Sequence, residues 1–169
     1  MEPFFSQALL QQPIRDIYLI YFEEEPKKDS SSPCQLIIAF QEDNHLLVVE
    51  DAYDGDHIDI RLSPSLQLES LLTEATESTV WKPYKTVPTD AIGVLLTGQI
   101  TQLLYAKDKS EFIMNGNLLQ GSQRFYTGLK LNCGQNCLTV FNNGVGLFVG
   151  VNSPLMPPFE ATYTWFAIG

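Results

Sequence analysis

The sequence predicts a mainly β protein of the α+β class, made of two tandem repeats of an antiparallel β-meander with a short N-terminal helix each. Two observations predict this fold. A set of apolar and aromatic landmarks occurs twice in the same order, at a displacement that drifts between 84 and 93 residues. Runs of β-branched and aromatic residues also alternate with glycine-containing turn signals in both halves. A pattern that recurs at a near-constant period indicates repeated structural units.

The landmarks divide the chain into repeats 1–86 and 87–169. The paired landmarks are Leu9-Leu10 with Leu95-Leu96, Ile14 with Ile100, Leu36 with Leu129, Leu46–Val49 with Leu138–Phe141, Ser63-Pro64 with Ser153-Pro154, Glu74–Thr76 with Glu160–Thr162, and Trp81 with Trp165. Each repeat is small for an independent domain and would bury a modest fraction of its surface alone. We therefore expect the two repeats to pack on each other about a pseudo-two-fold axis, as one compact unit.

The first repeat opens with a predicted helix over Phe4–Leu10, which follows Pro3. Strands are expected at 14–22, 35–40, 46–50 and 58–62, with a charged loop at 23–33, a hairpin at 41–44 and a turn at Asp54-Gly55. Ser63 and Pro64 predict the cap and first position of a helix, in which Leu68, Leu71, Leu72 and Ala75 share one face. The aromatic segment 80–84 closes the repeat.

The second repeat follows the same order, with a helix expected over 89–96. Strands are expected at 100–106, 129–133, 138–141 and 147–151, with a long loop at 107–126 and hairpin turns at Gly134 and Asn143-Gly144. Pro154, Pro157 and Pro158 exclude a helix comparable to that of the first repeat. The aromatic segment 163–166 ends the series.

Charge is divided unequally between the repeats. Up to Thr86 there are six Lys or Arg and sixteen Asp or Glu, and from Val87 onward there are four of each, so the first repeat carries the whole net charge of −10. This acidity argues against binding to nucleic acid or to anionic membranes, both of which attract clustered Lys and Arg. If charge guides a partner, that partner is a basic protein. Acidity that only aids solubility is the other interpretation.

An acidic cluster carries the one sharp functional hypothesis. It consists of Glu42, Asp43, Glu50, Asp51, Asp54, Asp56 and Asp59. At matching places the second repeat has Gln135, Asn136, Asn142, Asn143 and Gly146, so the acids are not expected to be needed for making the hairpins. Three interpretations stay open: a solvated hairpin edge, a surface for a basic partner, and a calcium site on Asp51, Asp54, Asp56 and Asp59, whose spacing is not that of an EF-hand.

Other chemistry receives little support from the sequence. Cys133 and Cys137 have a spacing allowed for zinc ligands, which His45 and His57 could join, whereas Cys34 lies in the other repeat. The two cysteines straddle a hairpin turn, which favours a structural role. A strained disulfide there would need an oxidising setting. We expect no metal site, no cofactor and no catalytic activity. The N-terminus shows no secretory signal and no apolar run is long enough to span a membrane, so we expect a cytoplasmic protein.

The first repeat resembles a known group of proteins through four motifs. These are Leu-Leu-x-x-x-Ile-x-x-Ile at 9–17, Leu-x-Ile at 36–38, Leu-Leu-Val-Val at 46–49 and Asp-Gly-Asp-x-Ile-Asp-Ile at 54–60. The pattern resembles the small acidic β-meander domains of bacterial immunity-type proteins. That resemblance implies binding and inhibition of a toxin domain, often a basic nuclease. The tandem duplication and the neutral second repeat depart from the pattern, and no functional residue is carried over.

The sequence thus predicts a non-catalytic protein-binding module, in its most concrete form an immunity-like inhibitor, that presents residues 42–59 to a basic partner. The alternative is a module that binds calcium or a small ligand through the acidic turns or the cleft between the repeats.

Overall fold

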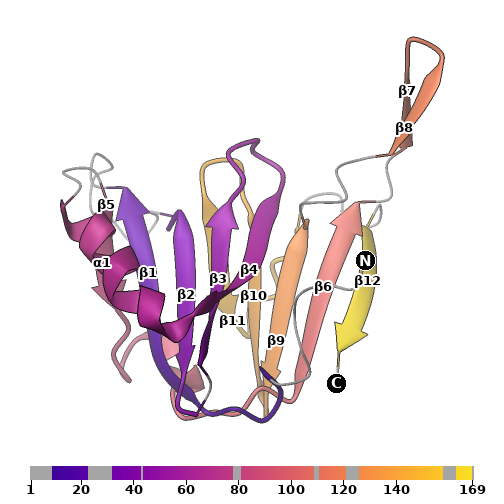
Figure 1. Ribbon diagram of the computed structural model, residues 1–169. Coiled ribbons are helices and arrows are strands. Elements are labelled where there is room, and N and C mark those ends of the chain that lie inside the picture. Colours follow the sequence, from indigo (N-terminus) through magenta and orange to yellow (C-terminus); the bar gives the residue numbers. More distant parts are fainter. Residues whose placement is uncertain are drawn as a thin grey trace.

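The computed structural model describes residues 9–22, 32–42, 44–77, 81–108, 111–120, 126–157 and 163–168, and they form two five-stranded antiparallel sheets and one α-helix (Figure 1). The order in sheet 1 is β4 (Ile58–Pro64), β3 (His45–Asp51), β2 (Gln35–Phe40), β1 (Ile14–Phe22) and β5 (Trp81–Lys85). The order in sheet 2 is β11 (Leu147–Val151), β10 (Asn136–Asn142), β9 (Gly128–Cys133), β6 (Gln102–Asp108) and β12 (Tyr163–Ile168). If the strands of each sheet are numbered in chain order, both sheets have the strand order 4-3-2-1-5. The mainly β prediction is confirmed.

The short N-terminal helix predicted for each repeat is not seen in the described residues. The single α-helix of the described residues is α1 (Leu68–Glu77), which follows β4. The helix expected over 89–96 is a five-residue 3-10 turn, Ala91–Leu95. A Cβ at Gly93 would lie 2.3 Å from the carbonyl oxygen of Val87, so the chain folds tightly back on itself there. Most of the helix expected over 4–10 lies outside the described residues.

Helix α1 has the predicted apolar face but begins later than the predicted cap. Strand β4 runs through Ser63 and Pro64, a 3-10 turn follows at Ser65–Gln67, and α1 begins at Leu68. Leu68, Leu71, Leu72 and Ala75 pack against one face of sheet 1, as their spacing predicts.

The prediction of a long loop over 107–126 is wrong for residues 111–120. The described part of this region contains a two-stranded hairpin, β7 (Glu111–Met114) and β8 (Asn117–Gln120), which projects from the body of the molecule (Figure 1). Asn115 and Gly116 both have positive φ angles, 53° and 78°, at its tip. An Asn-Gly pair between two apolar runs is a strong hairpin signal, and the sequence prediction gave it too little weight.

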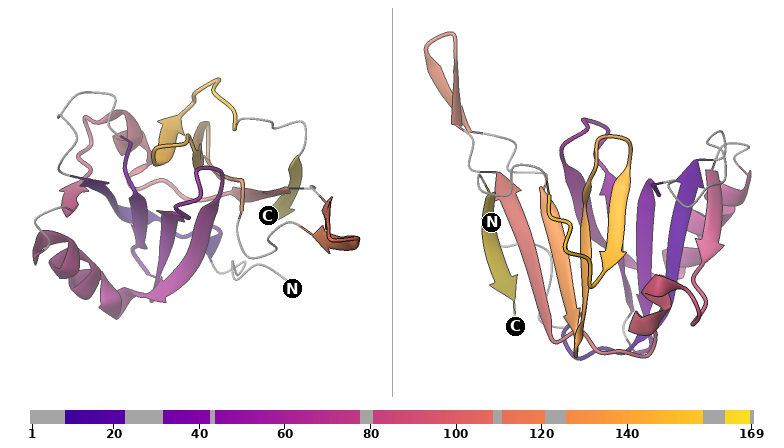
Figure 2. Two further views of the ribbon diagram at one scale, coloured as in Figure 1. Left: turned by 90° about the horizontal axis from the view of Figure 1, so that it is seen from above. Right: turned by 180° about the vertical axis from the view of Figure 1, so that it is seen from behind.

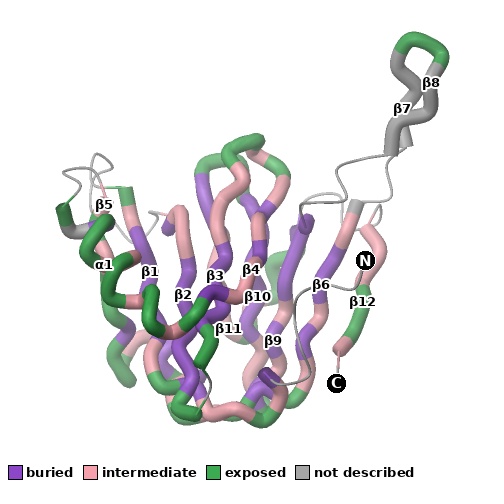
Figure 3. The backbone as a smooth tube through the Cα atoms, in the orientation of Figure 1, coloured by how far each residue is buried: buried purple, intermediate pink, exposed green. Residues whose placement is uncertain are grey.

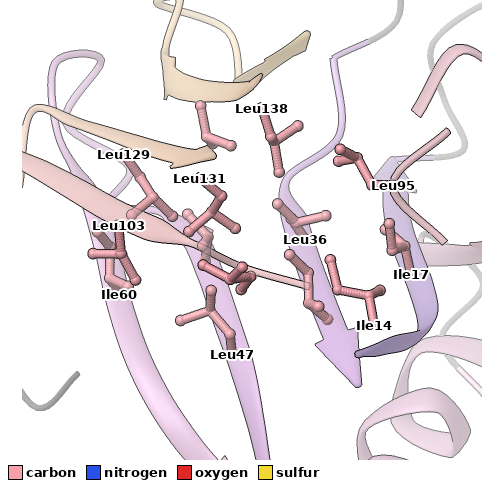
Figure 4. Close-up of a cluster of buried hydrophobic side chains, with 14 of the residues drawn as sticks. Ile14, Ile17, Leu36, Leu47, Ile60, Leu95, Leu103, Leu129, Leu131 and Leu138 are labelled. Atoms are coloured by element: carbon pink, nitrogen blue, oxygen red, sulfur yellow. The ribbon is translucent and has the colours of Figure 1, made fainter. Parts of the chain in front are cut away.

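One hydrophobic core fills the space between the two sheets (Figure 4). Leu36 and Leu47 from sheet 1 meet Leu131 and Leu138 from sheet 2, and all four side chains are fully buried. Burial of this kind contributes about 1.5–3 kcal/mol for each large aliphatic side chain. The tube in Figure 3 shows the buried positions concentrated in the strands that face this core.

A second, smaller core lies on the opposite face of sheet 1, beneath α1. Tyr18, Ile20, Ile37 and Val48 pack there against the apolar face of the helix. Sheet 1 is therefore covered on one face by sheet 2 and on the other by α1 (Figure 2).

Backbone hydrogen bonds connect the two sheets at matching places. Near the starts of β1 and β6, the N–H of Gln11 donates to the carbonyl of Ile100 at 2.7 Å, and that of Thr97 donates to the carbonyl of Ile14 at 2.8 Å. Gln11 and Thr97 have left-handed φ angles of 65° and 66°. The two donors, Gln11 and Thr97, are 86 residues apart, and so are the two acceptors, Ile100 and Ile14.

A second pair of bonds joins the starts of β4 and β11 to the opposite sheet. The N–H of Ile58 donates to the carbonyl of Tyr126 at 2.8 Å, and that of Leu147 donates to the carbonyl of Pro33 at 2.7 Å. Tyr126 shortly precedes β9, and Pro33 shortly precedes β2. Each sheet therefore continues into the other at two corners.

No helix of the described residues is long and apolar enough to cross a bilayer.

Candidate functional site

The structure divides the acidic cluster between the two ends of β3. Glu42 is exposed in the turn before β3, whereas Glu50 and Asp51 end the strand and Asp54 and Asp56 lie in the connection to β4. Asp59 stands directly opposite Glu50 on β4. Asp43 lies outside the described residues. The carboxylates therefore do not form one patch, and those at the β3–β4 end have different partners.

Glu50 and Asp59 share Arg61 as a partner. One oxygen of Glu50 accepts a hydrogen bond from the Arg61 guanidinium, and the other accepts from Gln35 Nε2 and, at 3.2 Å, from Arg61 Nη2. Arg61 Nη1 lies 3.6 Å from Asp59 Oδ2. The hydrogen bond to Glu50 raises the pKa of Arg61 above its ordinary value. These side chains form one polar row on the outer face of sheet 1.

Asp51 connects the two halves of the protein. Its Oδ1 accepts hydrogen bonds from the Tyr53 N–H and from Asn142 Nδ2, both at 2.8 Å. Asn142 is 3% exposed, and its Nδ2 also donates to the carbonyl of His57 at 3.0 Å. The Asp51 carboxylate therefore has a structural task at the junction of the sheets.

Asp54 organises its own turn. Its Oδ1 accepts hydrogen bonds from the N–H groups of Asp56 and His57 at 2.9 and 2.8 Å, and its Oδ2 lies 2.6 Å from His57 Nδ1. Desolvation alone would raise the pKa of Asp54, but these hydrogen bonds outweigh it and lower the pKa below the ordinary value. Asp56 is exposed.

The acids of the first hairpin and the amides of the second hairpin make equivalent contacts in their turns. In the second hairpin, Asn142 Oδ1 accepts from the Gly144 N–H, and Asn143 Oδ1 accepts from the N–H groups of Val145 and Gly146. Asp51 and Asp54 accept from residues at the same spacing in the first hairpin. The turns need side-chain oxygen atoms, and either an amide or a carboxylate supplies them.

The four aspartates weighed as calcium ligands do not converge. Asp51 is directed to Asn142, Asp54 to its own turn and Asp59 to Arg61. Across the described residues, no group of three or more His, Cys, Asp or Glu side chains is arranged to hold a metal ion.

The cysteines and histidines weighed as zinc ligands are also separated. Cys133 points into the core and lies opposite Asn136 in the β9–β10 ladder, so these two residues share one face of the sheet. Cys137 is the next residue after Asn136 and therefore lies on the other face. Neither forms a disulfide. His45 and His57 lie at opposite ends of the β3–β4 hairpin.

The β3–β4 end of sheet 1 also contains a groove, between α1 and the outer face of the sheet. Its volume is about 430 Å³, and its polar and aromatic lining includes Gln35, Glu50, Tyr53, Arg61, Glu74 and Trp81. The apolar floor comes from Ile20, Leu71 and Ala75. Volumes of this order lie within the range of small-ligand pockets.

Comparison of the chain with protein-family models, with curated proteins and with solved structures gives no match.

The groove offers charge and aromatic surface but no activated thiol. Burial, with Glu50 and Asp51 nearby, raises the pKa of the Cys34 thiol to about 12. Cys34 also donates to the carbonyl of Ile20 at 3.1 Å. At neutral pH this thiol stays protonated, and the thiol form is a poor nucleophile.

The sequence prediction missed Arg61, Glu74, Tyr53 and Trp81 as parts of one site. A signal for Arg61 was present: residues 58–62 alternate strictly, which places Asp59 and Arg61 on the same face of β4. Glu74 lies three residues after Leu71 on α1, so its side chain borders the apolar face of the helix and lies at the rim of the helix–sheet contact. No local signal indicates that Trp81 reaches this rim.

Proposed function

We propose that the protein is a non-catalytic binding module that presents the acidic end of the β3–β4 hairpin and the adjoining groove to a basic protein, in the manner of an immunity-like inhibitor. One observation carries the proposal. The polar row of Glu50, Asp59 and Arg61 belongs to sheet 1 alone, because the corresponding ladder positions in sheet 2 hold Phe141 and Phe148, whose rings stack at 4.7 Å. The ladder does not need the charges, so their presence in sheet 1 favours a task at the surface.

The experiment compares two pairs of charge-neutralising substitutions. Asp56→Asn with Asp59→Asn removes two negative charges at the proposed surface. Glu69→Gln with Glu77→Gln removes two from the face of α1 that points away from the groove, and serves as the matched control. The wild type is used to capture and identify its partner from the lysate of the source organism, and affinity for the purified partner is then measured at several salt concentrations.

We expect a basic partner whose affinity falls at least tenfold with the hairpin pair and with added salt, and changes little with the control pair. A partner without excess positive charge, or equal effects of the two pairs, would contradict the proposal.

We also propose that residues 1–86 and 87–169 are duplicated units packed about a pseudo-two-fold axis as one compact unit. Three observations support this. The two sheets have the same strand order. The bond from Gln11 to Ile100 has its reciprocal in that from Thr97 to Ile14, and the bonds of Ile58 and Leu147 are related in the same way. The core draws on both halves.

Co-expression of fragments 1–86 and 87–169 tests the single unit. Each fragment alone would expose its side of the shared core, so we expect the two to copurify at equal amounts and to fold together. Two fragments that fold separately as monomers would contradict this proposal.

A further inference from the structure

We propose that the groove beneath α1 receives a single basic side chain of the partner, an arginine in preference to a lysine. This inference rests on the proposed function and adds the subsite that recognises one residue. It follows from the charge, the aromatic walls and the size of the groove.

Among the described residues, those that line the groove carry a negative charge after their pairing is complete. Glu50, Glu74 and the adjacent Asp59 face one described cation, Arg61, whose guanidinium is directed to Glu50 and Asp59. Glu74 is exposed on α1 and has no hydrogen-bond or ion-pair partner among the described residues. A cation that enters the groove would find the Glu74 carboxylate available, with Glu50 behind it.

Two aromatic residues line the groove. Trp81 is half-buried and held edge-on against Phe22, with ring centroids 5.4 Å apart. Tyr53 is 75% exposed, although large aromatic side chains are usually buried. A planar guanidinium can stack on such rings while its N–H groups bind a carboxylate, which an ammonium group cannot do as well.

The backbone of Tyr53 is unusual for its residue type. Its φ angle is 61°, a left-handed conformation that is uncommon for a bulky side chain. In the second hairpin, the residue that donates to the equivalent side-chain oxygen is Gly144, with a φ of 95°. The first hairpin thus keeps a tyrosine where the fold accepts glycine, and the ring stands at the mouth of the groove.

The groove has room for a long basic side chain. Its volume of about 430 Å³ lies within the range of small-molecule sites. Its apolar floor of Ile20, Leu71 and Ala75 suits the methylene stem of a long basic side chain.

The test uses N-acetyl-arginine amide as the probe, with the lysine and uncharged citrulline analogues beside it. The chain has two tryptophans, and Trp165 in sheet 2 is an internal control for Trp81. Binding is followed through the indole N–H resonances, which are assigned with Trp81→Phe. We expect the arginine probe to shift the indole N–H resonance of Trp81 and not that of Trp165. Its affinity should be at least tenfold higher than that of the citrulline analogue, and it should also exceed that of the lysine analogue.

Two variants separate recognition from folding. Glu74→Gln should weaken the arginine probe at least fivefold, whereas Glu69→Gln should not. Tyr53→Gly should weaken the probe by a similar factor and leave the melting temperature unchanged or higher, because glycine accepts the positive φ. Unchanged affinity in both groove variants would overturn the inference.

The remaining outcomes distinguish the inference from the proposed function. A nona-arginine peptide is titrated in parallel against wild type and the Asp56→Asn, Asp59→Asn pair. If the peptide binds in a salt-dependent way that this pair weakens, but Trp81 does not respond to the arginine probe, the subsite is wrong and the acidic surface stands. Equal binding of citrulline and arginine would indicate a neutral small-ligand pocket and also overturn the inference. If the peptide does not bind even at low salt, the proposed function itself fails.

Discussion

The contact between Asp51 and Asn142 allows a direct test of how the two halves are joined. Asn142→Asp keeps the side-chain oxygen that accepts from the Gly144 N–H and removes only the donor that bonds Asp51 Oδ1 at 2.8 Å and the His57 carbonyl at 3.0 Å. The variant also places two carboxylates at hydrogen-bond distance, at a position where residue 142 is 3% exposed.

The magnitude follows from these losses. A hydrogen bond to a charged group contributes about 1.5–3 kcal/mol and one to a neutral carbonyl about 1 kcal/mol. Repulsion between two carboxylates at about 4 Å is about 4 kcal/mol at an effective dielectric constant of about 20, and relaxation reduces it. We expect a loss of about 3–5 kcal/mol in the free energy of unfolding at pH 7, a large part of the stability of a typical domain.

Two controls isolate the interaction. Asp51→Asn keeps an acceptor for both of its donors, so it should cost less than about 1 kcal/mol. The exchange of both residues, Asp51→Asn with Asn142→Asp, removes one of the two facing carboxylates and lets an amide donor face residue 142. Because the same Asp51 oxygen accepts from the Tyr53 N–H and from Asn142, that amide deprives the Tyr53 N–H of its acceptor, and the bond to the His57 carbonyl is lost as well. We therefore expect the double variant to regain the part of the loss that comes from repulsion between the carboxylates, with a coupling energy of about 1–3 kcal/mol.

Urea unfolding, followed by tryptophan fluorescence and circular dichroism, measures these free energies. In Asn142→Asp, one carboxyl that carries a proton can donate to the other, so the folded variant should bind that proton more tightly than the unfolded chain. Its deficit relative to wild type should then shrink as pH falls from 7 toward about 4. A loss below 1 kcal/mol at pH 7, or a double variant no more stable than the single one, would refute the reasoning.

Three further predictions concern the turn, the thiol and the acidic hairpin. Gly93→Ala should lower the free energy of unfolding by at least about 1–3 kcal/mol, because its Cβ would meet the Val87 carbonyl oxygen at 2.3 Å. Val94→Ala changes an exposed neighbour and is the control, and equal urea midpoints for the two variants would contradict the clash. Cys34, with a pKa of about 12, should react with iodoacetamide at pH 8 about a thousandfold more slowly than in the urea-unfolded chain. Mass spectrometry of the labelled peptide measures the two rates, and similar rates would show that the thiol is not buried as described. Asp54→Asn should cost less than about 1 kcal/mol at pH 7, since the Asp54 side chain is 41% exposed and Asn143 makes the equivalent turn. Because the folded-state pKa of Asp54 is lowered, its contribution is present above about pH 4 and is lost as pH falls through that pKa, so the difference between variant and wild type in urea unfolding should shrink as the pH is lowered from 4; a difference that grows would contradict the direction of the pKa shift.

The strands were predictable from sequence because each sheet has at least one face buried in a hydrophobic core. Alternation and apolar runs predicted strands at 14–22, 35–40 and 147–151 with the bounds that the structure has. Leu68, Leu71, Leu72 and Ala75 indicated the face of α1 for the same reason. What the sequence could not supply is the geometry of close approach, which made the region of Gly93 a 3-10 turn and not a helix.

The alignment of the two proposed repeats was harder to predict in continuous apolar runs. The landmark match placed Leu46 with Leu138, a displacement of 92. In the ladders Leu47 pairs with Ile38 and Leu138 pairs with Leu131, so on the proposed duplication Leu138 corresponds to Leu47, a displacement of 91. A slip of one residue exchanges the two faces of a strand. A run such as Leu-Leu-Val-Val has no polar residue to reveal which face each position takes, so the sequence alone left the parity undetermined.

The site was predicted only in part because its contacts cross strands and the helix–sheet boundary. Proximity along the chain collected Glu42 with Glu50, whereas the structure puts β3 between them. Arg61 was left outside the cluster although it is the partner of two of its members. Pairing across a ladder, not nearness in sequence, decides which charges remain uncompensated.

The two sheets together indicate which charges have a structural origin and which do not. At Asp51 and Asn142 the two halves meet, and a donor must face an acceptor, so identical carboxylates could not occupy both positions. The difference in charge there follows from the architecture. At Glu50 and Asp59 no such constraint acts, since the corresponding positions hold the stacked pair of Phe141 and Phe148. An outer-face position that accepts a phenylalanine stack in one sheet and an ion-pair network in the other is not fixed by folding. The charges that the fold does not require lie beside the groove, and that is where binding of a basic partner should be sought first.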